Sequence, residues 1–243
     1  MKANDFEFRR RGWFIGAIFC AAFGSYFFEP VNTVDWLLTI LNGFGLEDRW
    51  VSANMGMHLI FGTGAVLLAA GAWLRTWGTA YLRNEVVRDR VVHAERLIAD
   101  GPYRYVRNPL YFGNILLAAG LAPMAPPVGA VILVVGMTIF VLRLIGREEA
   151  FLLESRGNAY RQYLERVPRL WPALRPRVSG GGAQPRWIQA WAGELWMWVL
   201  TGAAIAFAIT FNPGLFDGIA WGGIILFLIV RAIMVRRARP RQV

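Results

Sequence analysis

The sequence predicts an all-α polytopic membrane protein with about six membrane segments, one pair of which forms a tight helical hairpin. The first observation is composition, since 56% of the 243 residues are hydrophobic and only 17% are charged. The second is charge patterning, because the arginines gather in blocks between long apolar runs. Placing every block except Arg49 on the cytoplasmic side satisfies the positive-inside rule and leaves both termini cytoplasmic.

The first module is predicted to hold the N-terminal membrane helices, residues 1–74. An apolar run from Gly12 to Phe28 follows Arg9 to Arg11 and lacks a small-residue cleavage site, so we expect a retained helix. Val34 to Leu41 has helical spacing, which fits an amphipathic segment or, equally, a loop with a buried turn. Met55 to Leu74 is long enough to cross the bilayer.

A polar block from Arg75 to Arg107 follows, and its arginines alternate with acidic residues. This pattern is typical of a folded cytoplasmic loop, so no nucleic-acid partner is expected despite the net charge of +10. The single cysteine, Cys20, excludes an intramolecular disulfide. His58 and His93 are interpreted as packing and loop residues, and no metal site is predicted.

The stretch from Gly101 to Tyr111, GPYRYVRNPLY, is the centre of the predicted site. Asn108 stands where a helix N-cap belongs and Pro109 at the first helical position. The helix start would present unpaired N–H groups and partial positive charge to a carboxylate or phosphate.

Two apolar limbs, Leu110 to Ala125 and Pro126 to Ile145, are predicted to form the helical hairpin, with Pro126 and Pro127 opening the second limb. The first limb is short and would reach only partway across the bilayer. A hairpin returns its far end to the starting face. It would therefore bring four charged residues back beside Arg107 and Asn108, namely Arg143, Arg147, Glu148 and Glu149.

Glu148 to Pro172 is predicted to form short interfacial helices, broken at Gly157 and Asn158 and ended by Pro168. Residues 173–190, rich in proline, glycine and arginine, form a predicted linker. A C-terminal transmembrane hairpin with a basic tail, residues 191–243, completes the chain, with spans from Trp191 to Phe211 and from Phe216 to Val235.

Three blocks together resemble the isoprenylcysteine carboxyl methyltransferase and phospholipid methyltransferase superfamily of integral membrane enzymes. They are the Gly101 to Tyr111 turn, the Glu148–Glu149 pair, and YRQYLERVPRLWP from Tyr160 to Pro172. The resemblance covers a core of residues 75–172 and implies S-adenosyl-L-methionine as the cofactor, bound at the cytoplasmic face. Many isoprenylcysteine enzymes carry histidine where Asn108 stands, so the acceptor stays open.

The resemblance and the charge pattern together define the predicted site. The catalytic candidates are Glu149, Arg143 and Arg166, where Glu149 would contact the cofactor or take a proton and the arginines would steer an anionic head group. Aromatic faces beside a carboxylate suit a sulfonium ion. The predicted cofactor-binding residues are Tyr103, Tyr105, Val106, Arg107, Asn108, Pro109, Tyr111, Glu148, Glu149, Tyr160, Tyr163 and Arg169.

The predicted function is methyl transfer to a lipid-like or otherwise hydrophobic acceptor that carries a carboxylate, amine or thiol. One alternative is a membrane sterol or steroid reductase that binds NADPH, since such enzymes share a Pro-x-Tyr-x-Gly turn like residues 109 to 113. The other alternative is a non-catalytic membrane scaffold. Membrane lipids are expected partners, and the oligomeric state is left open.

Overall fold

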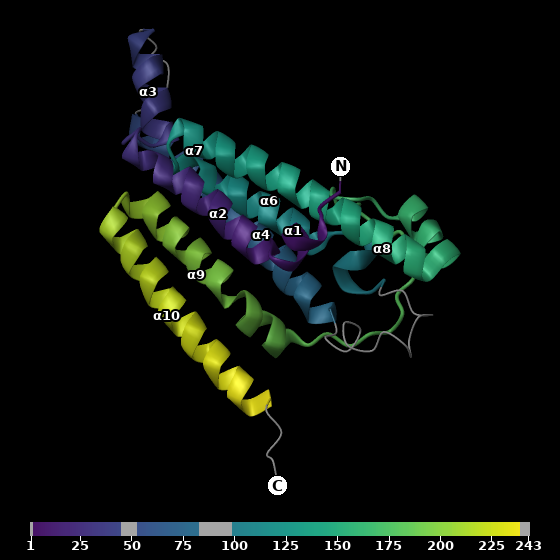
Figure 1. The fold of residues 1–243 in the computed structure, drawn as a ribbon. Helices are drawn as coiled ribbons and strands as arrows, with labels where there is room; N and C mark the ends of the chain where they lie inside the picture. The colour runs from purple at the N-terminus through teal and green to yellow at the C-terminus, as the bar shows by residue number, and fades with distance from the viewer. Residues whose placement is uncertain (1, 45–52, 83–98, 239–243) are drawn as a thin grey trace.

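The computed structural model describes residues 2–44, 53–82 and 99–238, and within these ranges the chain is helical with no strand (Figure 1). The arginines of the charge argument at positions 49, 83, 88, 90 and 96 lie outside the described residues, as does His93. The predicted all-α class is confirmed. The α-helices are α1 (Asp5–Arg9), α2 (Arg11–Gly24), α3 (Thr33–Gly43), α4 (Ala53–Tyr81), α6 (Pro109–Leu121), α7 (Pro127–Val131), α8 (Met137–Arg166), α9 (Trp187–Thr210) and α10 (Pro213–Ala238), with short turns η1 (Ser25–Phe27), η3 (Gly101–Arg104), η4 (Ala122–Met124) and η5 (Ile132–Gly136) between them.

Four helical segments in the described part of the chain are long and apolar enough to cross a membrane. They are Met55–Tyr81, Pro127–Arg166, Trp187–Thr210 and Pro213–Ile233. Helices α2 and α6 add two shorter apolar segments of 14 and 13 residues. At helical rise α6 is about 20 Å long, less than a bilayer core of about 30 Å. The start and the end of α6 therefore cannot both reach a membrane surface.

Glycines set a close contact between α4 and α6. A Cβ on Gly64 would lie 2.6 Å from the carbonyl oxygen of Gly120, and a Cβ on Gly120 would lie 2.6 Å from that of Gly64. Seven residues away on each helix, a Cβ on Gly71 would lie 2.9 Å from the carbonyl oxygen of Gly113. Small residues let membrane helices approach this closely. The antiparallel register that results brings the last turns of α4 beside the first turn of α6.

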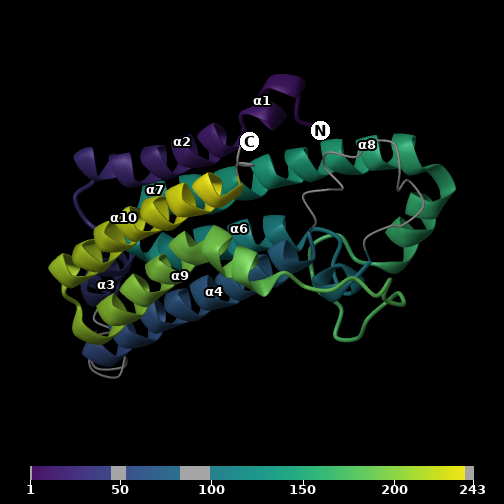
Figure 2. The same cartoon turned by 90° about the horizontal axis from the view of Figure 1, so that it is seen from below.

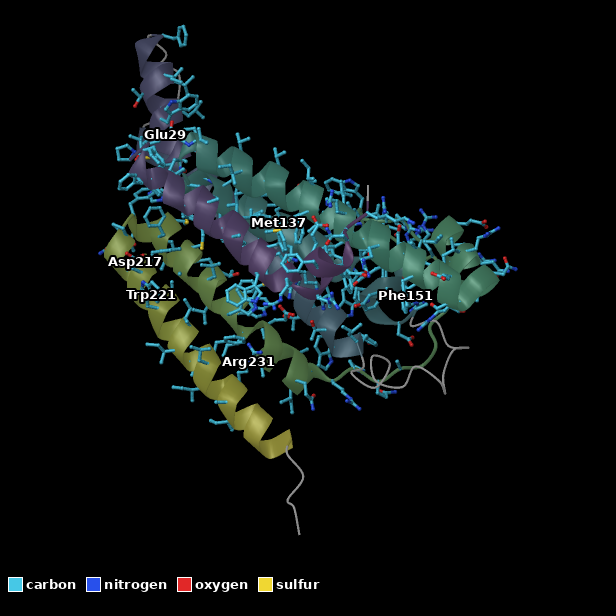
Figure 3. The ribbon with its side chains drawn as sticks, viewed as in Figure 1. Glu29, Met137, Phe151, Asp217, Trp221 and Arg231 are labelled. Atoms are coloured by element: carbon cyan, nitrogen blue, oxygen red, sulfur yellow. The ribbon has the colours of Figure 1, made fainter. Side chains whose placement is uncertain are left out.

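Helix α4 packs against α6 and also against α9, and α10 packs on α9 (Figures 1 and 2). Buried side chains from α4, α6, α8 and α9 meet in one apolar core, which includes Leu68, Leu117, Met137 and Met197. Figure 3 shows Asp217, Trp221 and Arg231 spaced along α10, and all three are exposed. Because only 6% of the apolar stretch within Pro213–Ile233 is buried, α10 presents most of its surface outward.

Helix α8 differs from the expectation of short helices after Glu148. It runs from Met137 to Arg166, with one non-helical residue, Gly157, at φ 53° and ψ −126°. The predicted break at Gly157 is therefore confirmed, but Glu148 and Glu149 lie within a long helix and not at the start of a new one. Figure 2 shows α8 extending past the other helices before the chain turns back. Phe151, labelled in Figure 3, lies on this extension.

Residues 167–186, here called the strap, contain no helix but are hydrogen-bonded along the loop at 99–107. The Ala173 N–H donates to the Tyr105 carbonyl (2.9 Å), and the Arg177 N–H donates to the Arg104 carbonyl (2.8 Å). The buried Asp100 carboxylate accepts from the N–H of Gly181 (2.7 Å) and of Ala183 (3.0 Å). The predicted linker is thus bound to the first half of the predicted site.

Candidate functional site

The first turn of α6 begins where the sequence predicts, with Asn108 at the N-cap position and Pro109 after it. No side chain caps the helix. Asn108 instead donates from Nδ2 to the Arg169 carbonyl (3.1 Å) and, more weakly, to Glu149 Oε1 (3.4 Å). Phe112 makes the first helical hydrogen bond, to the Asn108 carbonyl. The N–H groups of Leu110 and Tyr111 thus have no helical acceptor and could receive an anion.

Glu149 lies at the centre of a charged cluster. Its Oε1 is 3.5 Å from Arg107 Nε and its Oε2 is 3.0 Å from Arg169 Nη2. The Glu149 and Arg107 side chains are 14% and 12% exposed, whereas that of Arg169 is 42% exposed. Arg107 Nε is buried and makes no hydrogen bond within the described part of the chain. Two guanidinium groups therefore share one carboxylate. The cluster carries a net positive charge, and Arg107 Nε–H is a donor without an acceptor among the described residues.

The side chain of Glu148 points away from the cluster that Glu149 joins. Its Oε1 accepts a hydrogen bond of 2.9 Å from the Tyr111 hydroxyl. Its Oε2 forms no hydrogen bond with any residue that the structure describes. Tyr111 packs with Phe14 and Ile15 of α2 against α8. The two adjacent glutamates thus line different sides of α8, one beside arginines and one beside a tyrosine.

The predicted tyrosines hold the polar end of the bundle together. Tyr160 and Tyr163 are buried in a small cluster with Val167, and the Tyr163 hydroxyl donates to the Tyr103 carbonyl (2.8 Å). Burial first, and then the nearby Glu148 carboxylate, raise the pKa of the Tyr103 hydroxyl well above its ordinary value, so it stays protonated. The predicted cofactor contacts of Tyr103, Tyr160 and Tyr163 stay predictions, since the contacts described here are packing contacts and hydrogen bonds within the protein.

Tyr105 and Val106 complete the predicted stretch. The Tyr105 ring lies 5.7 Å from that of Trp77 on α4, and Val106 is fully buried. The Arg107 N–H between this stretch and α6 donates to the Pro168 carbonyl (2.9 Å). The strap and α4 therefore fix the backbone that leads into the site.

The structure does not bring Arg143 and Arg166 into the Glu149 cluster. Arg143 Nη2 donates to both carboxylate oxygens of Glu7 (2.7 and 2.8 Å), which lowers the pKa of Glu7. Arg147 likewise pairs with Asp5. Arginines four residues apart share one face of α8, and this face points to α1. Arg166 is exposed at the helix end, where its side chain forms no hydrogen bond or ion pair with the described residues.

Sequence reasoning missed a polar network between α4, α6 and α9. Arg75 donates from Nε and Nη2 to the two oxygens of Glu194 (2.8 and 3.0 Å) and from Nη1 to Asn114 Oδ1 (2.9 Å). Thr79 also donates to Glu194 (2.9 Å). Glu194 is the only charged residue of the apolar helix α9. A lone charge within a membrane span was the available signal.

These observations define the class as an integral membrane protein of helical type, with a polar site built from the Arg-Asn-Pro-x-Tyr turn and the paired glutamates. Residues 59–159 match the family model of phospholipid methyltransferase. This match includes α6 and both glutamates and excludes the strap, α9 and α10. Together with the relatives below, it confirms the predicted resemblance to the isoprenylcysteine carboxyl methyltransferase and phospholipid methyltransferase superfamily.

The chain is similar to three curated methyltransferases. It is 25% identical over 139 residues to protein-S-isoprenylcysteine O-methyltransferase B of Arabidopsis thaliana, covering 57% of this chain and 68% of the relative. Form A from the same plant is 28% identical over 138 residues, covering 56% and 68%. The enzyme of that name from Schizosaccharomyces pombe is 34% identical over 73 residues, covering 30% and 31%. No solved structure matches the chain.

Proposed function

We propose that the protein is an S-adenosylmethionine-dependent methyltransferase that acts on a hydrophobic acceptor in the membrane. The observation that carries the proposal is the convergence of Arg107 and Asn108 with Glu149, which lie about forty residues apart in the sequence and meet at the start of α6. This convergence lies inside the segment that matches phospholipid methyltransferase. The basic residues beside it favour a cytoplasmic position for the site.

The residues present fit the chemistry of this cofactor, which carries a carboxylate, an ammonium group and a sulfonium ion. The buried Arg107 Nε lacks a hydrogen-bond acceptor among the described residues, and Arg169 is partly exposed. Both guanidinium groups suit a carboxylate, as do the free N–H groups at the start of α6. Glu148 keeps one carboxylate oxygen for a cation. Anionic and cationic parts of one ligand would thus find partners on the two sides of α8.

When bound, the cofactor supplies an electrophilic methyl group, which passes from sulfur to the acceptor as the carbon–sulfur bond breaks. The residues of the chain would align the acceptor with that group in a site shielded from water. A carboxylate acceptor needs no base, whereas an ammonium or thiol acceptor must first lose a proton. Glu148, hydrogen-bonded to Tyr111, is placed to take such a proton.

The acceptor is proposed to be lipid-like, with its reacting group at the edge of the apolar layer. Since the start of α6 bears the site and the helix is apolar beyond Asn114, a hydrocarbon tail could pack beside that apolar part while the head group stays at the polar end. Each methylene buried would favour binding by up to about 0.8 kcal/mol. Acceptors with one head group and progressively shorter tails should therefore be methylated less efficiently, and equal turnover of a tailless acceptor would exclude this substrate class.

The test of the function is direct ligand binding to the detergent-purified protein. Radiolabelled S-adenosylmethionine should bind the wild type, and Asn108→Ala should weaken that binding. Glu7→Gln, which changes a residue paired with Arg143 and not with the cluster, serves as the control and should bind normally. Binding of NADPH without S-adenosylmethionine would favour the reductase alternative, and binding of neither cofactor would favour a scaffold.

A further inference from the structure

The Arg75–Glu194 pair has features that a salt bridge serving only to hold two helices together does not need. Glu194 is only 5% exposed, and both of its carboxylate oxygens accept from Arg75. Thr79 adds a third donor. A charged pair within membrane spans is rare and is by default a candidate for function. Glu194 lies on α9, outside the segment that matches the methyltransferase family.

The same guanidinium also reaches the helix that bears the proposed site. Arg75 Nη1 donates to Asn114 Oδ1 (2.9 Å) and lies 3.4 Å from the carbonyl oxygen of Leu110. Leu110 lies in the first turn of α6, between Pro109 and Tyr111. The side chain of Arg75 crosses α6 at Gly113, where a Cβ would overlap Arg75 Cγ and approach its Cδ to 3.0 Å. The glycine thus permits the contact.

The planar guanidinium group makes these bonds in a fixed geometry. Its five donors form a rigid fork, so anchoring one edge on Glu194 fixes the direction of the other edge. That other edge holds a backbone carbonyl of the turn from Asn108 to Tyr111. Helices α4, α6 and α9 lie side by side at this point (Figure 2).

We infer that Arg75 and Glu194 are positioning residues for the proposed cofactor site, with Glu194 orienting Arg75 and Arg75 fixing the first turn of α6. This inference rests on the proposed function. It gives α9 a role in the site although, among the described residues, α9 forms no hydrogen bond or ion pair with the Glu149 cluster. The C-terminal hairpin then belongs to the working core of the enzyme and is more than a membrane anchor.

If the role of the pair were purely structural, its loss would lower stability without changing cofactor affinity, so the experiment measures stability and binding separately. Glu194→Gln keeps the shape of the side chain and removes its charge. Arg75→Lys keeps the charge but loses the fork that spans Glu194 and α6. The matched control is Glu7→Gln, which breaks another pair with two carboxylate oxygens, on α1 and α8. All variants are compared by thermal unfolding, by S-adenosylmethionine affinity and by amide exchange across residues 108–114.

We expect both Glu194→Gln and Arg75→Lys to weaken S-adenosylmethionine binding by tenfold or more, up to about a hundredfold. Amides in residues 108–114 should exchange faster in both variants, while the control should change neither property. Unaltered affinity and exchange in folded Arg75→Lys would overturn the inference, as would faster exchange without loss of affinity. If Glu194→Gln does not fold, Arg75→Lys decides alone.

The outcome also distinguishes this inference from the proposed function. Failure of the wild type to bind S-adenosylmethionine would refute the function and, with it, the cofactor role of the pair. Binding by the wild type and both variants with equal affinity would leave the function standing and refute only the positioning role.

Discussion

Replacing Glu149 by glutamine should destabilise the protein by about 3 kcal/mol, because the change leaves a buried guanidinium without its counter-charge. The Arg107 and Glu149 side chains are mostly buried, at 12% and 14% exposed, and their charged atoms are 3.5 Å apart. Removing one member of such a pair costs about 3–5 kcal/mol, and glutamine retains an acceptor, which favours the lower end. Arg169 adds little to this figure because its side chain is 42% exposed, and exposed pairs contribute about 0–1 kcal/mol.

A double-mutant cycle measures this contribution. Arg107→Gln, Glu149→Gln and the combined variant are unfolded by titration with sodium dodecyl sulfate, and Arg169→Gln serves as the exposed control. The combined variant should be more stable than the two single changes predict, by about 2 kcal/mol of coupling. The control should lose less than about 1 kcal/mol. S-adenosylmethionine affinity, measured on the folded variants, should fall at least about tenfold for Glu149→Gln, since a charge-assisted contact is lost.

Two results would refute the reasoning. Additive effects of Arg107→Gln and Glu149→Gln would show that the 3.5 Å contact carries no net energy. Undiminished S-adenosylmethionine affinity in Glu149→Gln and in Asn108→Ala would remove both residues from the cofactor site, whatever the stability data show.

Three further outcomes follow from other contacts. Gly120→Ala places a Cβ 2.6 Å from the Gly64 carbonyl oxygen and should cost about 1–3 kcal/mol in detergent unfolding, whereas Gly62→Ala, with nothing within 4 Å, should not; equal effects would reject the glycine contact. The lowered pKa of Glu7 means that its pairing with Arg143 stabilises the docked α1 above the ordinary value of 4.5 and is lost as pH falls through the lower folded value. Amide exchange across Asp5–Arg9, compared with that of Glu7→Gln at each pH, should report that loss, and the same transition in Glu7→Gln would show that Glu7 does not cause it. In a Cys20→Ala background, single cysteines at Gly181 and Asn212, both exposed, should be labelled from opposite sides of the membrane, and labelling from one side would overturn the topology.

The fold could be predicted from the sequence because its signals are local. Apolar length marks the spans, Asn108 and Pro109 mark the start of α6, and Gly157 marks the break in α8. The sequence also predicted that Arg107 and Glu149 lie close together, since a helical hairpin must return its far end to the membrane face where it starts. These inferences depend on periodicity and turn chemistry, which one sequence displays directly.

Helix rotation and long-range pairing could not be predicted in the same way. Arg143 and Glu149 are six residues apart, and only the packing of α1 decides that Arg143 faces Glu7. The Arg75–Glu194 pair joins residues 119 apart through a helix beyond the recognised core. The strap reads as a linker by composition, yet its backbone is bonded to Tyr105 and Arg104. Each of these contacts depends on tertiary packing, which no local sequence pattern predicts.

The two adjacent glutamates offer a physical reason for how a zwitterionic ligand would be oriented. On one side of α8, Glu149 shares its charge with Arg107 and Arg169, and the start of α6 adds partial positive charge, so that side attracts anions. On the other side, Glu148 accepts a hydrogen bond from the Tyr111 hydroxyl through one carboxylate oxygen and leaves the other oxygen for a cation. A cofactor with a carboxylate and a sulfonium ion would lower its energy in only one of two opposite orientations. Arg107 and Arg169 would then hold the carboxylate on one side of α8, and Glu148 would hold the sulfonium on the side where Tyr111 packs with α2.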